Sequence, residues 1–221
     1  MKSLDQIRSE FDRIADLSSR LPDVLGPHER SLLRHLPKDA SIALDLGCGT
    51  GALARRLALH CKRVVAIDTS LQMIQQARTR SARFPNIEFH VSEIGEWLDA
   101  HGSYDCITAT AVLHHVEIKH IVEKIVRALR SGGTLLIVDV ITRPGLRNLP
   151  VNAISSIIAG LRRLIVLRTL SRDLGKAWRE HGSGETYLTI SEARRLFERL
   201  LPASQVRHHL LWRYSVVWTK P

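Results

Sequence analysis

The chain has 221 residues and a formal net charge of +10, with 32 Lys and Arg against 22 Asp and Glu. This length suits one α/β domain with a full hydrophobic core. The three cysteines stand singly, without the spacing of a disulfide framework or a metal site. No apolar run reaches the roughly 18 residues of a membrane span. These features argue against a disulfide scaffold and a membrane-spanning protein, and we expect a cytoplasmic protein.

The positive charge is unevenly distributed along the chain. Residues 1–142 carry a net charge of +1, residues 143–181 carry +6 and residues 182–221 carry +3. A protein that binds phosphates over its whole surface would spread this charge more evenly. The pattern favours a basic local cap, or a surface in the last third of the chain that meets an acidic substrate or a membrane.

Strands and helices alternate over the first two thirds of the chain. Apolar, β-branched runs predict strands, and apolar residues at helical spacing predict the helices between them. The predicted strands are 41–46, 63–68, 87–91, 104–110 and 134–141, and the predicted helices are 52–60, 70–81 and 117–130. Ser70 is expected to cap the second of these helices. Five strands that alternate with helices predict a mostly parallel, doubly wound α/β sheet.

Residues 143–190 interrupt this alternation. A helix is predicted at 151–169, where an apolar stripe is flanked by arginines, and a polar stretch follows at 172–184. We interpret residues 143–190 as a helical lid insertion. In a doubly wound fold, such a lid would lie near the carboxyl ends of the strands, over the ligand crevice.

The C-terminal part of the chain returns to regular elements. Ser191 is expected to cap a helix that ends at Leu200, and residues 205–218 are typical of two closing strands. We therefore interpret residues 1–221 as a single domain, in which residues 1–36 form an N-terminal helical cap.

A glycine-rich segment, Ala43–Gly51, follows the pattern of a buried strand, a tight loop and a helix N-terminus. Because glycine has no Cβ, such a loop lets a ligand approach backbone N–H groups closely. Gly47, Gly49 and Ala52 also fit the looser dinucleotide fingerprint. Asp45 lies two residues before the first glycine, where its carboxylate would repel a pyrophosphate and attract a cationic amino-acid group. The segment therefore favours a cofactor that carries an ammonium group.

The sequence Leu-Asp-Leu-Gly-Cys-Gly-Thr-Gly in this segment resembles motif I of the class I S-adenosylmethionine-dependent methyltransferases. Further motifs of the family follow in order over residues 40–142, ending with Gly132-Gly133. The resemblance implies a Rossmann-like, seven-stranded sheet with an antiparallel closing strand, and S-adenosyl-L-methionine as the cofactor. It also implies that Asp45 positions the methionine end of the cofactor and that Asp68 accepts hydrogen bonds from the ribose hydroxyls.

The resemblance assigns a larger set of residues to the cofactor. They are Phe11, Asp45, Gly47, Cys48, Gly49, Gly51, Asp68, Thr69, Met73, Glu93, Ile94 and Thr110. Met73 would pack against the adenine, or else serve as an ordinary core methionine. Ser92-Glu93 replaces the family's small residue followed by Asp, and Phe11 replaces its usual Tyr and so loses a hydroxyl.

Two adjacent histidines, His114 and His115, follow the fourth predicted strand. His115 is a candidate general base, because an imidazole titrates near neutral pH, or it only shapes the pocket. Metal binding is not expected, because an isolated pair lacks ligand spacing and partners. Four residues of the lid region are expected to contact the substrate: Trp178, His181, Glu185 and Tyr187.

These observations predict methyl transfer from S-adenosylmethionine to a small-molecule acceptor, by in-line displacement at the sulfonium. A nucleic-acid methyltransferase is an alternative, favoured only by the basic last third; we expect no nucleic-acid partner. A second alternative is a non-catalytic cofactor-binding protein whose basic lid binds a partner or an acidic membrane. A nicotinamide-dependent oxidoreductase is a third alternative, which the sequence favours least. The oligomeric state is left open.

Overall fold

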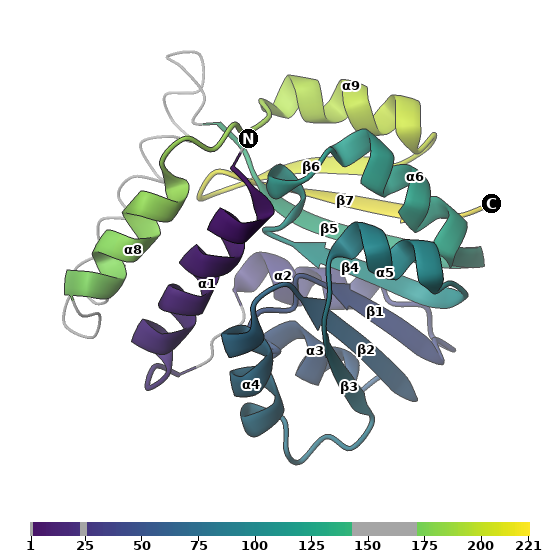
Figure 1. Ribbon diagram of the computed structural model, residues 1–221. Coiled ribbons are helices and arrows are strands. Elements are labelled where there is room, and N and C mark those ends of the chain that lie inside the picture. Colours follow the sequence, from purple (N-terminus) through teal and green to yellow (C-terminus); the bar gives the residue numbers. More distant parts are fainter. Residues whose placement is uncertain (1, 23–25, 143–171) are drawn as a thin grey trace.

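The computed structural model describes residues 2–22, 26–142 and 172–221. A seven-stranded sheet with the strand order β3-β2-β1-β4-β5-β7-β6 forms the centre of the molecule (Figure 1). The strands are β1 Ile42–Leu46, β2 Arg63–Asp68, β3 Ile87–Val91, β4 Tyr104–Thr110, β5 Leu129–Val140, β6 Gln205–His209 and β7 Arg213–Thr219. Strands β1 to β5 are parallel, and β7 lies antiparallel between β5 and β6. This confirms the expected Rossmann-like, mostly parallel fold with an antiparallel closing strand.

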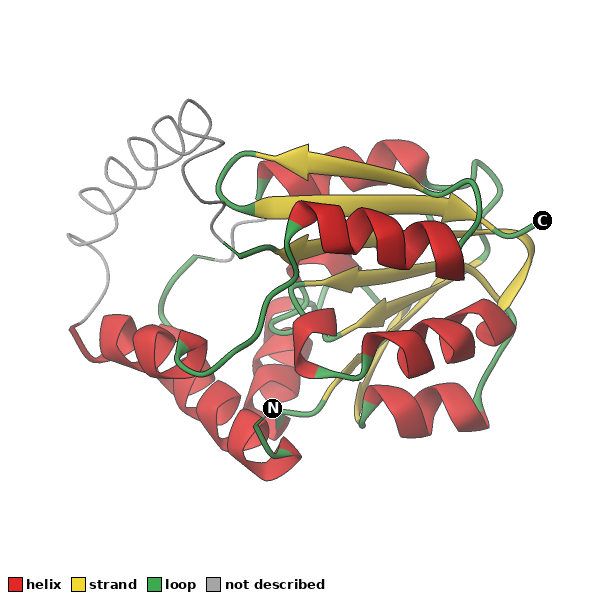
Figure 2. Cartoon of the chain, turned by 90° about the horizontal axis from the view of Figure 1, so that it is seen from above, coloured by secondary structure: helices red, strands yellow, loops and turns green. Residues whose placement is uncertain are grey.

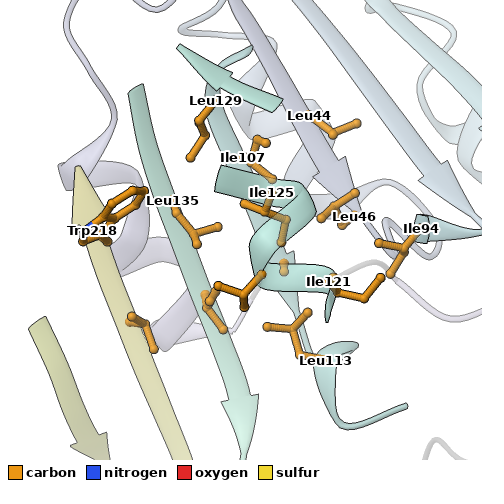
Figure 3. Packing of buried hydrophobic residues seen from close by; sticks show 14 of the residues in the cluster. Leu44, Leu46, Ile94, Ile107, Leu113, Ile121, Ile125, Leu129, Leu135 and Trp218 are labelled. Atoms are coloured by element: carbon orange, nitrogen blue, oxygen red, sulfur yellow. The ribbon is translucent and has the colours of Figure 1, made fainter. Parts of the chain in front are cut away.

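Helices cover both faces of the sheet. They are α1 Leu4–Ser18, α2 Pro27–Leu32, α3 Ala52–Leu57, α4 Leu71–Arg80, α5 Ile94–Ala100, α6 Ile118–Ala128, α8 Arg172–Gly182 and α9 Ile190–Leu200, with 3₁₀ turns η1 Leu33–His35 and η2 Leu113–His115. One hydrophobic cluster lies between the sheet and α5, α6 and α9, where Ile121 and Ile125 of α6 face strand residues such as Leu46 and Leu135 (Figure 3). A second cluster lies between the other face and α2, α3 and α4. This double burial explains the continuous apolar runs of β1, β2 and β4.

Helices α1 and α8 pack side by side, although they come from distant parts of the chain (Figure 1). Both lie toward the carboxyl ends of the parallel strands (Figure 2). A third, smaller cluster joins them through Ile14, Ala15, Leu174 and Ala177, with Met73 of α4 beneath. The part of the expected lid that the structure describes is therefore docked on the N-terminal helix.

The start of β5 differs from the sequence prediction. Helix α6 ends at Ala128, and the chain is already extended at Leu129, which pairs with Tyr104 of β4. The register then shifts before Thr134. The Ser-Gly-Gly segment forms this irregularity: Gly132 has a φ of +76°, and a Cβ on the next glycine would lie 2.8 Å from a backbone oxygen. The glycines therefore permit a bulge in a strand.

Two further boundaries can be compared with prediction. Ser70 caps α4 as expected, because its hydroxyl accepts the N–H of Met73. The cap of α9 is Thr189 and not Ser191, since Thr189 and Glu192 form a reciprocal capping box. The helix predicted at 151–169 lies outside the described residues. Among those that are described, no helix is long and apolar enough to cross a membrane.

Candidate functional site

The glycine loop after β1 is held in a conformation that only glycine adopts easily. Gly47, Gly49 and Gly51 have φ values of +65°, +52° and +81°. A Cβ on Gly47 would lie 2.6 Å from Cγ2 of Val112, whereas a Cβ on Gly49 would meet no atom within 4 Å. The N–H of Cys48 donates to the carbonyl of Ile67 at 2.9 Å. The loop is therefore packed closely at its first glycine and open at its second.

Asp68, at the end of β2, is bonded to this loop. Its carboxylate accepts the N–H of Gly49 at 2.9 Å and the N–H of Ser70 at 2.9 Å. Burial raises the pKa of Asp68, and these two hydrogen bonds oppose the rise. The family resemblance assigned Asp68 and the glycines to the same cofactor, and the geometry shows a direct contact between Asp68 and Gly49.

Asp45, in β1, is fully buried below the loop. Its Oδ1 accepts the hydroxyl of Thr108 at 2.7 Å, while its Oδ2 is buried without a hydrogen-bond partner among the described residues. Burial raises the pKa of Asp45 to about 7 and the nearby Asp68 raises it further, although the bond from Thr108 and the backbone N–H of Ala54 lower it. An acceptor in this position is poised to receive a donor from outside the protein.

Helix α1 is tied to the region after β2 by polar contacts that the sequence did not reveal. The Arg8 guanidinium donates to the carbonyl of Thr69 at 3.3 Å and lies 3.7 Å from Glu93. Asp12 accepts the hydroxyl of Ser70 at 2.5 Å, and also the N–H of the second residue of α4 at 3.2 Å. The only signal in the sequence was the position of Asp12 next to Phe11, in an element that resembles one of the family.

The remaining cofactor candidates fall into different surroundings. Glu93 precedes the buried Ile94 at the start of α5, beside the end of β3. Thr110 ends β4 and is partly exposed. Met73 is buried in the small cluster that contains residues of α1 and α8. Cys48 is buried, and burial raises its pKa well above the ordinary value.

Phe11 lies on the face of α1 that meets the histidines. Its ring centroid is 4.6 Å from that of His181 and 5.8 Å from that of His115. His181 belongs to α8, and its ring is 5.0 Å from that of His115. Three residues that were predicted separately, for the cofactor, the substrate and catalysis, therefore meet in one place.

His115 is buried, and both of its ring nitrogens lack a hydrogen-bond partner among the described residues. Its Nδ1 lies 3.4 Å from Oε1 of Glu185, without the geometry of a hydrogen bond. Burial lowers the pKa of His115 to about 3, and His114 and His181 lower it further. A neutral imidazole of such low basicity is poorly matched to general-base catalysis near pH 7.

Of the other substrate candidates, Glu185 and Tyr187 lie in the segment that follows α8, and Trp178 lies in α8 itself. Tyr187 lies beside His114, with ring centroids 5.2 Å apart, and its carbonyl accepts the hydroxyl of Thr142. Trp178 is 47% exposed and meets His181 edge-on at 5.9 Å. The structure therefore places His181 and Tyr187 against the histidine pair and leaves Trp178 at the surface.

Comparison with known proteins agrees with this geometry. A family model described as a methyltransferase domain matches residues 43–133. An uncharacterized methyltransferase of Mycobacterium tuberculosis is 31% identical over 190 residues, covering 84% of this chain and 90% of that protein. A ubiquinone biosynthesis O-methyltransferase of Xanthomonas oryzae is 28% identical over 143 residues, covering 59% of this chain and 60% of that protein.

A solved structure shows the same fold. The N-methyltransferase NodS of Bradyrhizobium japonicum, in complex with S-adenosyl-L-homocysteine, covers 97% of this chain and 98% of its own, with a TM-score of 0.64 and 20% identity. The chain belongs to the class I S-adenosylmethionine-dependent methyltransferases. Its residues fit that cofactor: the loop is open at Gly49, and within residues 2–22, 26–142 and 172–221 the buried Oδ2 of Asp45 has no donor of the kind that an ammonium group would supply.

Proposed function

We propose that this methyltransferase acts on a small-molecule acceptor and holds its donor across the β1 and β2 loops. The observation that supports the donor site is the buried Oδ2 of Asp45, which has no hydrogen-bond partner in the part of the chain that the structure describes and lies below a loop that is open at Gly49. Bound S-adenosylmethionine supplies a methyl group that its sulfonium already activates. The task of the chain is to orient the donor and the acceptor in line and to exclude water.

Each donor contact follows from the chemistry of the residues. Asp45 pairs with the ammonium group, which compensates for the burial of its carboxylate. Asp68, already fixed by two backbone N–H groups, accepts from the ribose hydroxyls with its remaining lone pairs. Glu93 and Ile94 border the adenine at the end of β3, and Phe11 closes the site from α1.

The acceptor side is formed by η2 and the segment after α8. A cavity of about 170 Å³ lies there, lined by residues that include His114, Asp139, Glu185 and Tyr214. This volume supports a small acceptor. The relatives point the same way, since one is named for O-methylation in ubiquinone biosynthesis and NodS is an N-methyltransferase.

Methyl transfer from radiolabelled S-adenosylmethionine tests the class of acceptor. We expect label in low-molecular-weight amines, phenols or thiols, and none in tRNA, duplex DNA or protein. Transfer to nucleic acid that weakens steeply with salt would overturn the small-molecule proposal. Cofactor binding with no transfer to any pool, and co-sedimentation with anionic liposomes, would favour the non-catalytic alternative instead.

A further inference from the structure

Three imidazole side chains meet beside the carboxyl end of β4. His114 and His115 come from η2, and His181 comes from α8. One ring nitrogen of each lies within 4.8 Å of a ring nitrogen of each of the others. The absence of metal binding was expected because the histidine pair had no further ligand nearby in sequence. The fold supplies that ligand from a distant helix, so this reason does not hold.

A carboxylate stands behind two of the three rings. Nδ1 of His114 lies 2.7 Å from Oδ1 of Asp139, and Nδ1 of His181 lies 2.9 Å from Oε2 of Glu10. Because a carboxylate only accepts, both Nδ1 atoms carry a proton; in the neutral ring, which is the form that binds a metal, the lone pair is then on Nε2. Carboxylates orient the histidine ligands of metal centres in this way.

His115 also has a carboxylate beside its ring, but the two groups do not form a hydrogen bond. Its Nδ1 lies 3.4 Å from Oε1 of Glu185, and the two side chains are only 4% and 3% exposed. Neither ring nitrogen of His115 nor this carboxylate oxygen has a hydrogen-bond partner among the described residues. Buried polar atoms left unpaired at one point call for a missing partner. With the proton of His115 on Nδ1, which faces Glu185, the partner of Nε2 must interact with a lone pair.

The charges around the cluster also suit a cation. Asp139, Glu10 and Glu185 contribute three carboxylates. Lys2 contributes one ammonium group, which lies 2.8 Å from Glu10 and 3.8 Å from Glu185. With the three rings in the neutral form that binds a metal, three negative charges against one positive charge leave a net charge of −2. A divalent cation balances this excess in a buried place where an uncompensated charge is costly.

We propose that His114, His115 and His181 bind one divalent transition-metal ion of the zinc class through their Nε2 atoms. Imidazole ligands suit zinc, cobalt, nickel and iron, whereas magnesium and calcium prefer oxygen. Ligand nitrogens around tetrahedral zinc are about 3.3 Å apart, so the rings must draw closer than the observed 4.8 Å. Three protein ligands leave a fourth position, which a water molecule or a donor atom of the acceptor could take.

Cobalt substitution tests this site directly. The full-length protein, prepared without a polyhistidine tag, is treated with a chelator and titrated with Co²⁺ in the absence of S-adenosylmethionine. We expect one equivalent per chain, the visible absorption bands of low-coordinate Co²⁺, and displacement of Co²⁺ by Zn²⁺. S-adenosylmethionine binding is measured separately, so failure of the metal proposal is distinguishable from failure of the donor site.

Four variants locate the metal. His181→Ala and His115→Ala should abolish the absorption bands, and Glu10→Gln should weaken Co²⁺ binding roughly 10- to 100-fold, because Glu10 acts only through His181. His120→Ala is the matched control, since His120 is exposed on α6 and should leave binding unchanged. Circular dichroism identifies any variant that fails to fold, and the two variants that remove a proposed ligand, His115→Ala and His181→Ala, lie in different elements.

The opposite results would overturn the proposal. They are the absence of stoichiometric Co²⁺ binding to the folded wild-type protein, or binding that persists unchanged in both His115→Ala and His181→Ala. Loss of Co²⁺ from the wild type and from every variant alike during gel filtration would also contradict the proposal, because it would show that the metal binds only weakly at the surface. A rise in the melting temperature of the wild type with Zn²⁺, lost in His181→Ala, gives an independent reading of the same equilibrium.

Discussion

At the scale of single residues, Gly47 and Gly49 share a left-handed backbone but differ in their surroundings. A side chain on Gly47 would collide with Val112, whereas one on Gly49 would occupy open space at the mouth of the loop. Gly47→Ala should therefore destabilise the protein by about 2–4 kcal/mol, from backbone strain and overpacking together. Gly49→Ala should cost about 1 kcal/mol and weaken S-adenosylmethionine binding at least roughly tenfold. Urea unfolding and calorimetry measure the two effects.

The double variant of Gly47→Ala with Val112→Ala separates strain from collision. If the collision matters, the second substitution should cost less in the Gly47→Ala background than in the wild type. If Gly47→Ala and Gly49→Ala had equal stability and equal affinity for the cofactor, the two glycines would not have the different roles that their surroundings indicate.

Asp45 predicts a dependence of stability on pH. Because burial raises its pKa to about 7, the free protein retains a proton there that the unfolded chain releases near pH 4. The free energy of unfolding therefore falls as the pH rises from about 4 to 7, by up to about 4 kcal/mol from this group, and the loss is complete above the folded pKa. Asp45→Asn, which is always neutral, should thus be more stable than the wild type at pH 8 and nearly equal to it at pH 4.

The cofactor should reverse this advantage. Since an ammonium group favours the ionised carboxylate, S-adenosylmethionine should bind the wild type more tightly than Asp45→Asn at pH 8 and should stabilise it more. Denaturant unfolding at several pH values, with and without the cofactor, measures both effects. A constant difference in stability between the two proteins across pH would mean that Asp45 does not titrate in this range.

At the scale of elements, α1 and α8 rest on a cluster that is smaller than the two clusters on the faces of the sheet. We expect their amides to exchange hydrogen faster than those of β1 and β4, because fewer buried apolar contacts protect them. S-adenosyl-L-homocysteine should slow exchange in α1, since Arg8 and Asp12 contact the segment after β2. Mass spectrometry of peptic peptides resolves these elements.

Helix α9 provides the reference for that experiment. It packs beside β6, at the opposite edge of the sheet from β2 and β3, and should respond little to the ligand. If the amides of α1 exchanged hydrogen as slowly as those of β1 in the free protein, α1 and α8 would not be less stable than the sheet. An equal response of α1 and α9 to the ligand would argue against coupling through the β2 loop.

The strands around the donor site were predictable, because burial on both faces demands continuous apolar runs. The motif after β1 also specified the loop, since glycine adopts its positive φ values most readily. The start of β5 was not predictable in the same way: Gly132 and Gly133 read as a helix terminator, although they form a bulge. The cap at Thr189 was missed because Ser191, two residues later, has a similar side chain, and only the reciprocal bond to Glu192 distinguishes them.

The histidine cluster shows the limit of local patterns more clearly. His115 and His181 belong to different elements, and no spacing rule connects them. Their contact depends on how α8 docks on α1, which is a matter of tertiary packing. The carboxylates of Glu10 and Asp139 come from two more elements. A sequence argument could name His115 and His181 singly, but it could not place them together.

At the scale of the whole molecule, the parallel sheet explains why the donor site could be inferred from motifs far apart in sequence. The ends of β1, β2 and β4 meet at one edge, so the residues that follow each strand become neighbours. The proposed acceptor side depends on α1, α8 and the segment after α8, which carry no comparable motif. Residues 143–171, which contain much of the basic excess, lie outside the described residues.

Calorimetric titration with S-adenosylmethionine tests the central claim, that this chain binds its methyl donor between Asp45 and Asp68. Wild type and Glu96→Gln, an exposed carboxylate on α5, should bind one equivalent with equal affinity. Asp68→Ala should lose at least roughly tenfold, because hydrogen bonds to a charged group contribute about 1.5–3 kcal/mol. Absence of binding to the folded wild type, or unchanged affinity in Asp68→Ala, would contradict the account.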